Sequence, residues 1–261
     1  MLLSRRLLIF TLSVLAPMGM LAQGHRGMGE PSLNKGLMEM PAIRNLDVVL
    51  VYNGFVINYN TERLIPNWVA YELTTEEVAG QVPRARGFSM DLDYKDKQAM
   101  REDYSNTGWD KGHMAPSADM KWSQTAMNES FYLTNICPQN HDLNGKDWQT
   151  LEKYVREWAV KYGKVWVVCG PYVYQNQYGS IGDRGVIVPD GFFKAILRSE
   201  GKDYYSIAFV FENKSARQPV KNAVVSVNDV EALVGVNFFT NLNDKIEDIV
   251  ESQSNWDDWT K

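Results

Sequence analysis

One helical repeat among several strand-like segments constrains the fold of this chain most strongly. Between residues 148 and 162, apolar side chains recur at steps of three and four residues, which predicts an amphipathic helix that ends at Gly163. Strand-like segments flank this helix on both sides, and short turns join several of them. These segments are residues 46–60, 67–74, 164–173, 190–199 and 203–213. The pattern favours an α+β fold with an antiparallel sheet over a doubly wound parallel sheet.

The two ends of the chain are expected to lie outside this fold. Residues 1–22 join two arginines to an apolar run as long as a signal-peptide core, which predicts a secretory signal cleaved after Ala22. An uncleaved membrane anchor is the alternative. Residues 23–45 resemble an exported linker, residues 46–250 would form the folded domain, and residues 251–261 a polar C-terminal tail. The expected location is secreted or periplasmic, with no membrane contact after cleavage.

The overall charge does not favour nucleic-acid binding. Removal of residues 1–22 leaves 25 basic and 32 acidic residues, a formal charge of −7. Such a protein repels nucleic acid unless its positive charge is concentrated locally. One window of the chain does concentrate it, with Arg84, Arg86, Lys95, Lys97, Arg101, Lys111 and Lys121.

The cysteine count points to no catalytic thiol. Cys137 and Cys169 both lie in apolar, strand-like segments. Export would permit a disulfide, but two cysteines do not form a disulfide framework. A single bridge and two buried thiols fit the sequence equally well.

Residues 110–116, DKGHMAP, contain His113, one of three histidines in the chain. Alone, this segment predicts only a turn, in which Gly112 allows a close approach of the backbone. About thirty residues later, a predicted strand (FYLTN) leads to Asn144 at the start of the helix and Glu152 two turns further on. At this spacing the two side chains lie roughly along one row of a regular helix. The resulting order is a strand with histidine, a second strand, and a helix with asparagine and glutamate.

This order resembles the ββα-metal, or His-Me finger, nucleases, and more closely the DNA/RNA non-specific endonuclease family. The family's Asp-Arg-Gly-His motif and its following proline match residues 110–116, with Lys111 in place of the arginine. The resemblance covers about residues 48–250 and implies a central antiparallel sheet flanked by helices. The other matching residues are Arg86, Phe88, Asp91, Thr134, Asn135, Pro138, Gln139, Leu143, Asn144, Trp148, Leu151 and Glu152.

The resemblance implies a metal-dependent endonuclease that hydrolyses phosphodiester bonds of DNA and RNA and leaves 5′-phosphates. His113 suits the general base, because an ordinary histidine pKa of about 6.5 leaves it mostly neutral. Asn144 would bind Mg²⁺ directly, and Glu152 would act as a second catalytic group by holding the ion's waters. Mn²⁺ or another divalent ion can substitute in such a site.

Basic residues would complete the site by contacting phosphate. Arg86 would stabilise charge on the phosphoryl oxygens, because its planar fork matches two oxygens. Arg84 is the nearby alternative and a candidate substrate contact. Lys111 keeps the charge of the family's arginine without its fork, and would bind or orient phosphate. Asn135 is a further candidate substrate contact.

Each candidate also has a structural explanation. Asn144 could cap the helix, a position that asparagine favours, and Glu152 could lie on a solvated helix face. Asp110 could hold the turn, Asn135 could brace the strands, and Trp148 could belong to the core.

The expected partners are DNA and RNA, bound through phosphate and sugar without sequence preference. Whether the protein forms a homodimer is left open. Two other functions also fit the sequence. One is a nuclease-fold protein that binds nucleic acid with little turnover, and the other is a phosphodiesterase for another substrate, such as cyclic nucleotides or lipids.

Overall fold

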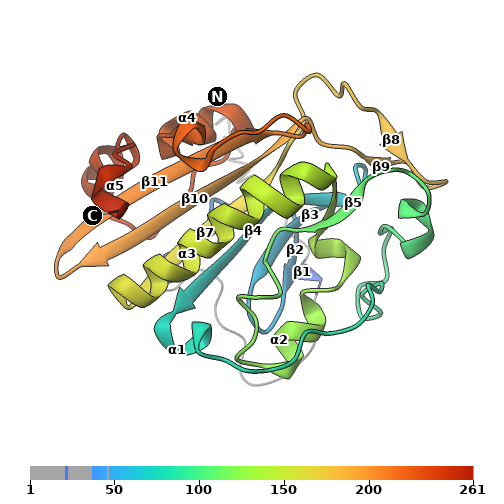
Figure 1. Ribbon diagram of the computed structural model, residues 1–261, viewed down its shortest axis with the longest axis horizontal. Coiled ribbons are helices and arrows are strands. Elements are labelled where there is room, and N and C mark those ends of the chain that lie inside the picture. Colours follow the sequence, from blue (N-terminus) through green and yellow to red (C-terminus); the bar gives the residue numbers. More distant parts are fainter. Residues whose placement is uncertain (1–20, 23–36, 46, 261) are drawn as a thin grey trace, which may run out of the picture.

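A computed structural model describes residues 21–22, 37–45 and 47–260. Its centre is one sheet whose strands, within the described residues, follow the order β1-β2-β3-β4-β7-β10-β11-β12 (Figure 1). β1 and β2 pair in parallel and the other neighbours pair antiparallel. The strands are β1 (Leu21–Ala22), β2 (Val48–Val51), β3 (Val56–Asn60), β4 (Ile65–Thr74), β7 (Lys164–Tyr172), β10 (Gly191–Glu200), β11 (Asp203–Glu212) and β12 (Val224–Val225).

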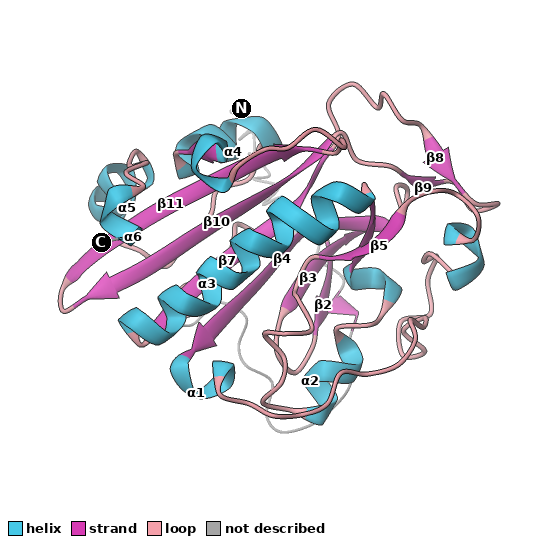
Figure 2. Cartoon of the chain, viewed as in Figure 1, coloured by secondary structure: helices cyan, strands magenta, loops and turns pink. Residues whose placement is uncertain are grey.

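Side chains alternate across this sheet and form one apolar cluster on each face. Along β4, Tyr71 belongs to one cluster and its neighbour Ala70 to the other. The first face packs against α3 (Gln149–Tyr162), which runs along the sheet in Figure 2. The second face packs against α4 (Val227–Val234) and α5 (Asp244–Glu251). The predicted α+β fold, an antiparallel sheet flanked by helices, is confirmed.

The segment from residue 75 to residue 163 is inserted between β4 and β7, which are neighbours in the sheet. It contains a second, small antiparallel pair that leads into α3. Its elements before α3 are α1 (Thr75–Val78), η1 (Arg101–Tyr104), β5 (Asp110–His113), α2 (Gln124–Glu129), η2 (Leu133–Asn135), β6 (Ile136–Gln139) and η3 (Leu143–Trp148). The remaining elements of the chain are β8 (Ser180–Ile181), β9 (Val186–Ile187), η4 (Val220–Ala223) and α6 (Asp257–Thr260).

The predicted strand FYLTN is wrong in its position. Residues 133–135 form the 3-10 helix η2, and the strand β6 follows it at residues 136–139. Phe131 and Leu133 are both buried. Their two-residue spacing, which suggested a strand, therefore reflects burial and not an extended backbone. The side chain of Asn135 donates to the carbonyl of Ser130, 2.9 Å away, which closes a turn where a strand would run straight.

The N-terminal part of the domain begins earlier than predicted. Met40, expected in a linker, is 2% exposed and joins the second apolar cluster. The amide of Ala42 donates to the carbonyl of Asn237 at 2.8 Å. Most of the predicted signal and linker, residues 1–20 and 23–36, lies outside the described residues. Among the helices that the structure describes, none has the length and hydropathy of a membrane span.

The C-terminal segment packs on the domain, so its interpretation as a polar tail is wrong. Trp259 in α6 is 2% exposed, and its ring centre lies 4.8 Å from that of Trp158 in α3. The guanidinium of Arg198 lies 4.9 Å from the centre of the Trp259 ring. Burial of the apolar tryptophan surface therefore stabilises the packing of this segment, although acidic residues lie beside the tryptophans in the sequence.

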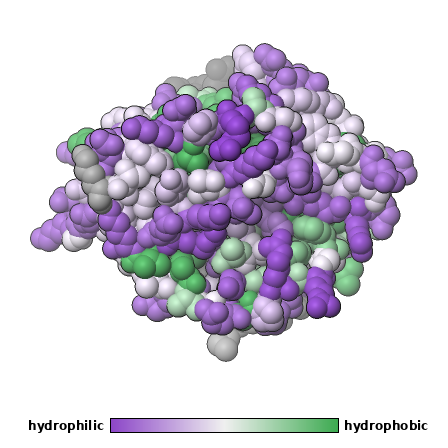
Figure 3. All heavy atoms as spheres, viewed as in Figure 1, coloured by the Kyte–Doolittle hydropathy of each residue, from purple (hydrophilic) through white to green (hydrophobic). Residues whose placement is uncertain are grey.

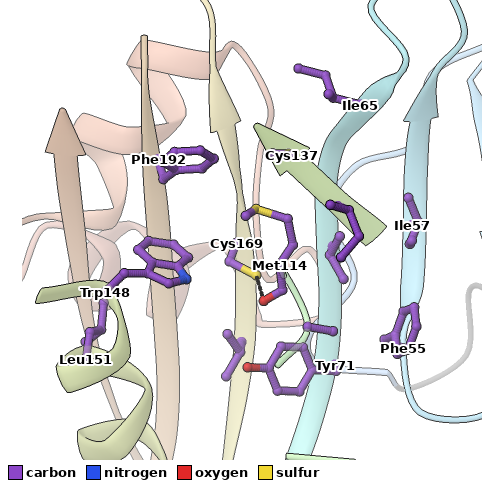
Figure 4. Close-up of a cluster of buried hydrophobic side chains, with 14 of the residues drawn as sticks. Phe55, Ile57, Ile65, Tyr71, Met114, Cys137, Trp148, Leu151, Cys169 and Phe192 are labelled. Carbon is purple, nitrogen blue, oxygen red and sulfur yellow. Dashed lines mark hydrogen bonds between the residues drawn. The ribbon is translucent and has the colours of Figure 1, made fainter. Parts of the chain in front are cut away.

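Both cysteines are free and lie in the first apolar cluster (Figure 4). The Cys169 thiol donates to the carbonyl oxygen of Met114 at 3.2 Å. Burial raises the pKa of Cys169 to about 11 and the pKa of Cys137 well above its usual value. Neither is a reactive thiolate at neutral pH.

Candidate active site

Three consecutive elements, β5, β6 and α3, build the candidate site. β5 and β6 pair antiparallel, with His113 opposite Ile136 and Asp110 opposite Gln139. Gly112 allows these strands to approach, because a Cβ at this position would lie 2.2 Å from Oε1 of Gln139. A larger residue would push the buried Gln139 side chain away from the strand that carries His113.

Asn144 lies in a π-helix and not in a regular α-helix. This element, η3, precedes α3 directly. The predicted row of Asn144 and Glu152 assumed 3.6 residues per turn, and the wider π turn changes that spacing. Asp147 in η3 accepts bonds from Arg217 Nε at 3.1 Å and from the amide of Gln218 at 2.8 Å. π-helical turns occur often at functional sites, where they redirect a side chain.

His113 is half-buried between two aromatic rings. Its ring centre lies 5.2 Å from that of Phe88 and 4.9 Å from that of Phe131. Its Nε2 is buried and has no hydrogen-bond partner among the described residues. Burial, with a contribution from Arg84, lowers the pKa of His113 to about 3. The imidazole is therefore neutral at physiological pH, and a neutral imidazole has one ring nitrogen that can accept a hydrogen bond.

The Asn144 side chain is held by a carboxylate. Its Nδ2 donates to Oδ2 of Asp110 at 2.9 Å, and His141 Nδ1 lies 3.0 Å from the same oxygen. A carboxylate only accepts hydrogen bonds, so the NH₂ group faces Asp110 and the amide oxygen Oδ1 faces away from it.

Glu152 lies in a charged and partly buried environment. Burial raises the pKa of Glu152 to about 7, Lys194 opposes this rise, and Asp119 adds to it. Asp119 is itself fully buried. It accepts from Arg156 Nη1 at 2.7 Å and from the Tyr71 hydroxyl at 2.9 Å. Small changes in these neighbours can shift Glu152 between its neutral and charged forms near pH 7.

The structure brings Arg84, and not Arg86, close to His113. The Arg84 guanidinium lies 4.9 Å from the centre of the Phe131 ring, which also contacts His113. Arg84 donates to the Ser117 hydroxyl, four residues beyond His113. Arg86 is exposed and makes no hydrogen bond, ion pair or ring contact with any other residue that the structure describes.

Lys111 shares an aromatic neighbour with His113. Its Nζ lies 5.8 Å from the centre of the Phe88 ring and 5.1 Å from that of Tyr104. Burial and the nearby Arg101 lower the pKa of Lys111. Lys111 therefore lies on the Phe88 side of His113, and its contact with phosphate stays a prediction.

Asn135 is not placed to contact substrate. It is fully buried, its Oδ1 accepts from the amide of Ala115, and its Nδ2 donates to the carbonyl of Ala115, each at 2.9 Å. Both ends of its amide are therefore used to brace the segment after His113. The prediction of a substrate contact is wrong for this residue.

Sequence reasoning missed several residues around the site. His141, Asp119, Arg156 and Lys194 were assigned no role. Arg156 lies one helical turn after Glu152, so its spacing could have drawn attention to it. Nothing in the local sequence indicates that Asp119 and Lys194 are buried beside them.

The oxygen atoms present suit a hard divalent cation. Asn144 offers an amide oxygen, and Glu152 offers a carboxylate two turns further on. No group of three or more His, Cys, Asp or Glu side chains able to hold a metal occurs in the described part of the chain. An ion at Asn144 would therefore keep most of its ligands as water, as Mg²⁺ commonly does.

An antiparallel strand pair that carries a histidine and leads into a helix with asparagine and glutamate defines the fold of the ββα-metal nucleases. A chain from the crystal structure of the EndoG/EndoGI complex has the same fold, with a TM-score of 0.75 and 28% identity over 84% of this chain and 96% of that chain. Residues 36–245 match the model of the DNA/RNA non-specific endonuclease family. The chain belongs to this family.

Curated relatives agree with this assignment. The chain is 34% identical over 215 residues to "Nuclease EXOG, mitochondrial" of Mus musculus, which covers 76% of this chain and 58% of the relative. It is 30% identical over 208 residues to "Endonuclease G, mitochondrial" of Homo sapiens, and the matched region covers 72% of this chain and 68% of the relative. It is 32% identical over 207 residues to "Nuclease C1" of Cunninghamella echinulata var. echinulata, and the matched region covers 73% of this chain and 82% of the relative.

These relatives confirm the predicted family and contradict the predicted location. The chain is a member of the DNA/RNA non-specific endonuclease family. EXOG and endonuclease G are named as mitochondrial proteins, which contradicts the predicted secreted or periplasmic location. The matched region spans 58% of the mouse EXOG protein. The substrates and activity of this chain are therefore matters of proposal.

Proposed function

We propose that this chain is a Mg²⁺-dependent endonuclease that hydrolyses phosphodiester bonds of both DNA and RNA and leaves 5′-phosphate ends. The observation that carries the proposal is His113, a neutral imidazole whose buried Nε2 has no hydrogen-bond partner among the described residues. Buried polar atoms are almost always paired, so an unpaired one in such a site indicates a ligand or a water.

His113 would accept the proton of the attacking water at Nε2. Phe88 and Phe131 hold its ring on two sides, which limits its orientations. General-base catalysis of this kind contributes roughly 10²–10⁴-fold. The rest of the acceleration must come from charges arranged around the phosphate.

Arg84 would stabilise the charge that builds up on the phosphoryl oxygens, the role that spacing assigned to Arg86. Its guanidinium shares the Phe131 ring with His113. Lys111 would add a second positive charge on the Phe88 side.

Asn144 Oδ1 is the ligand that we propose for Mg²⁺, with Glu152 accepting hydrogen bonds from the ion's waters. When bound, the ion supplies positive charge against the phosphate and the leaving oxygen. A neutral amide ligand leaves that charge intact. Glu152 can serve in this way only when ionised, because its protonated form donates at one of its oxygens.

The acidic net charge does not prevent substrate binding. Residues 84–121 hold seven basic and seven acidic side chains. Asp91, Asp103 and Asp119 are at most 2% exposed, which leaves an excess of basic groups at the surface of this segment. Figure 3 shows the face that carries α3 as mostly hydrophilic, with smaller apolar patches. Contacts to phosphate alone suit a nuclease that does not discriminate between sugars or sequences.

Digestion of supercoiled plasmid and of RNA tests the proposal. Purified protein is incubated with each substrate in Mg²⁺ and in EDTA, beside His113→Ala. We expect nicking and RNA cleavage in Mg²⁺ only, and a loss of at least about a hundredfold in the variant. Cleavage that persists in EDTA, or full activity of the variant, would refute it. Binding without cleavage would identify a nucleic-acid-binding protein, and cleavage of cyclic nucleotides or lipids alone a different phosphodiesterase.

A further inference from the structure

The hydrogen bond between Asp110 and Asn144 joins the start of β5 to the π-helix. Asn144 Nδ2 and His141 Nδ1 lie 2.9 Å and 3.0 Å from the same oxygen of Asp110. We propose that Asp110 is a positioning residue, which turns the Asn144 amide so that Oδ1, and not Nδ2, faces the metal. This inference rests on the proposed function, because it assumes that Asn144 binds the ion.

The oxygen and the NH₂ group of asparagine are nearly equal in size, so packing alone does not decide which of them points into a site. Only the oxygen can bind a cation, because the NH₂ group has donors and no acceptor. A carboxylate beside the amide removes the ambiguity, since it accepts hydrogen bonds and never donates them.

The same bond strengthens the ligand atom. Donation from Nδ2 to a charged acceptor draws electron density toward Oδ1, as a carboxylate does for a metal-bound histidine. Asp110 also places a negative charge near the ion. It therefore acts through orientation, polarisation and charge, which the experiment must separate.

Among the described residues, the hydrogen bond to Asp110 is the only one that fixes the orientation of the Asn144 amide. Asp110 is fixed by strand pairing with Gln139. The backbone of Asn144 is fixed by its amide, which donates to the carbonyl of Asn140 at 2.9 Å. Removing the Asp110 carboxylate therefore frees the Asn144 side chain while both backbones keep their own bonds.

Mg²⁺ affinity measured by calorimetry, with Mg²⁺ alone as the probe, tests this role. Asp110→Asn keeps the shape but can donate or accept, and Asp110→Glu keeps the charge but moves the carboxylate. We expect both variants to bind Mg²⁺ about 10–100-fold more weakly than the wild type, with little change in Tm. His141→Gln is the matched control and should retain affinity within a fewfold.

A second measurement reads the orientation itself. The side-chain NH₂ resonances of Asn144, assigned by their loss in Asn144→Ala, report on their acceptor. A hydrogen bond to a carboxylate gives these two resonances chemical shifts that differ from those of solvated asparagines. Asp110→Asn should change these chemical shifts. Asp110→Glu with unchanged affinity would leave only a charge effect and overturn the proposal, as would Asp110→Asn with affinity within twofold of the wild type.

The two proposals can fail separately. A wild-type protein that binds Mg²⁺ through Asn144 and cuts no nucleic acid refutes the proposed function and leaves the positioning role to stand. A wild-type protein that cuts nucleic acid while Asp110→Asn retains its Mg²⁺ affinity refutes the positioning role alone. If Mg²⁺ does not bind, or if Asn144→Ala binds it as well as the wild type, the positioning role is refuted.

Discussion

The ammonium group of Lys194 lies 4.7 Å from the centre of the Trp148 ring, fully buried and without a hydrogen-bond partner among the described residues. A buried charge needs compensation, and a cation over the face of an aromatic ring is only partly compensated. Of the charges around Glu152, Lys194 affects its pKa most strongly and lowers it. Lys194 thus lies in the core of the domain and influences the charge of the Glu152 carboxylate in the candidate site.

Lys194→Met should shift the pH dependence of cleavage upward. The pKa of Glu152 is about 7, and the loss of Lys194 would raise it further. The ionised form of Glu152 exists above that pKa, so the rate should rise at a higher pH than in the wild type. A pH–rate profile for plasmid nicking measures this shift. Lys194→Arg keeps the charge and should keep the wild-type midpoint, and a common profile for all three proteins would contradict the prediction.

Arg84→Ala should reduce the cleavage rate far more than Arg86→Ala. Arg84 shares the Phe131 ring with His113 and donates to the Ser117 hydroxyl, whereas Arg86 makes no such contact with the described residues. Removal of one group that stabilises transition-state charge costs about 10²–10³-fold in kcat. Single-turnover kinetics on a short duplex measure both variants. Equal losses, or a larger loss for Arg86→Ala, would return the role to the residue that sequence spacing favoured.

Gly112→Ala should destabilise the domain by about 1–3 kcal/mol through overpacking. The added Cβ would lie 2.2 Å from Oε1 and 2.7 Å from Cβ of Gln139, so shortening the Gln139 side chain alone cannot relieve the clash. Urea unfolding measures the loss, and Gly112→Ala combined with Gln139→Gly should recover part of it. Gly145→Ala is the matched control, because a Cβ there meets no atom within 4 Å. Equal unfolding free energies for the two alanine variants would contradict the clash.

Glu251→Gln should gain stability relative to the wild type as the pH rises. Burial, with Glu231, Glu247 and Asp248 nearby, raises the pKa of Glu251 to about 9. Between pH 4.5 and 9 the unfolded chain releases this proton and the folded chain keeps it, so wild-type stability falls with rising pH. Glutamine cannot ionise and escapes this loss, which should reach roughly 1–3 kcal/mol at pH 8. Unfolding in urea at pH 5 and pH 8 gives the difference, and a constant difference would argue against a buried neutral acid.

Local sequence patterns were sufficient for the elements whose residues interact with near neighbours. The three- and four-residue repeat predicts the helix that the structure shows as α3, and Gly163, with a φ of 86°, follows its last residue. Alternation and β-branching predict the hairpin-linked strands of the central sheet. The motif around His113, with Asn144 and Glu152, indicates the ββα unit because all its parts lie within about forty residues.

Contacts between distant segments decided what these patterns could not. The tryptophan contact of Trp259 with Trp158 turned a predicted polar tail into part of the domain. Arg84 and Arg86 are nearly equivalent by spacing, and only the folded chain shows which one reaches the Phe131 ring. By sequence, Asn135 could brace the strands or bind substrate. In the folded chain its amide is fully hydrogen-bonded to Ala115 and Ser130.

The sequence by itself determined the family and the α+β fold, and it predicted the histidine, asparagine and glutamate of the candidate site. These follow from side-chain periodicity and from short motifs, which depend on covalent neighbours. The tertiary structure alone decided the π-helical turn at Asn144, the carboxylate of Asp110 that faces it and the buried Lys194. Each of these depends on burial and on hydrogen bonds between segments that are far apart in the chain, and a linear pattern does not contain that information.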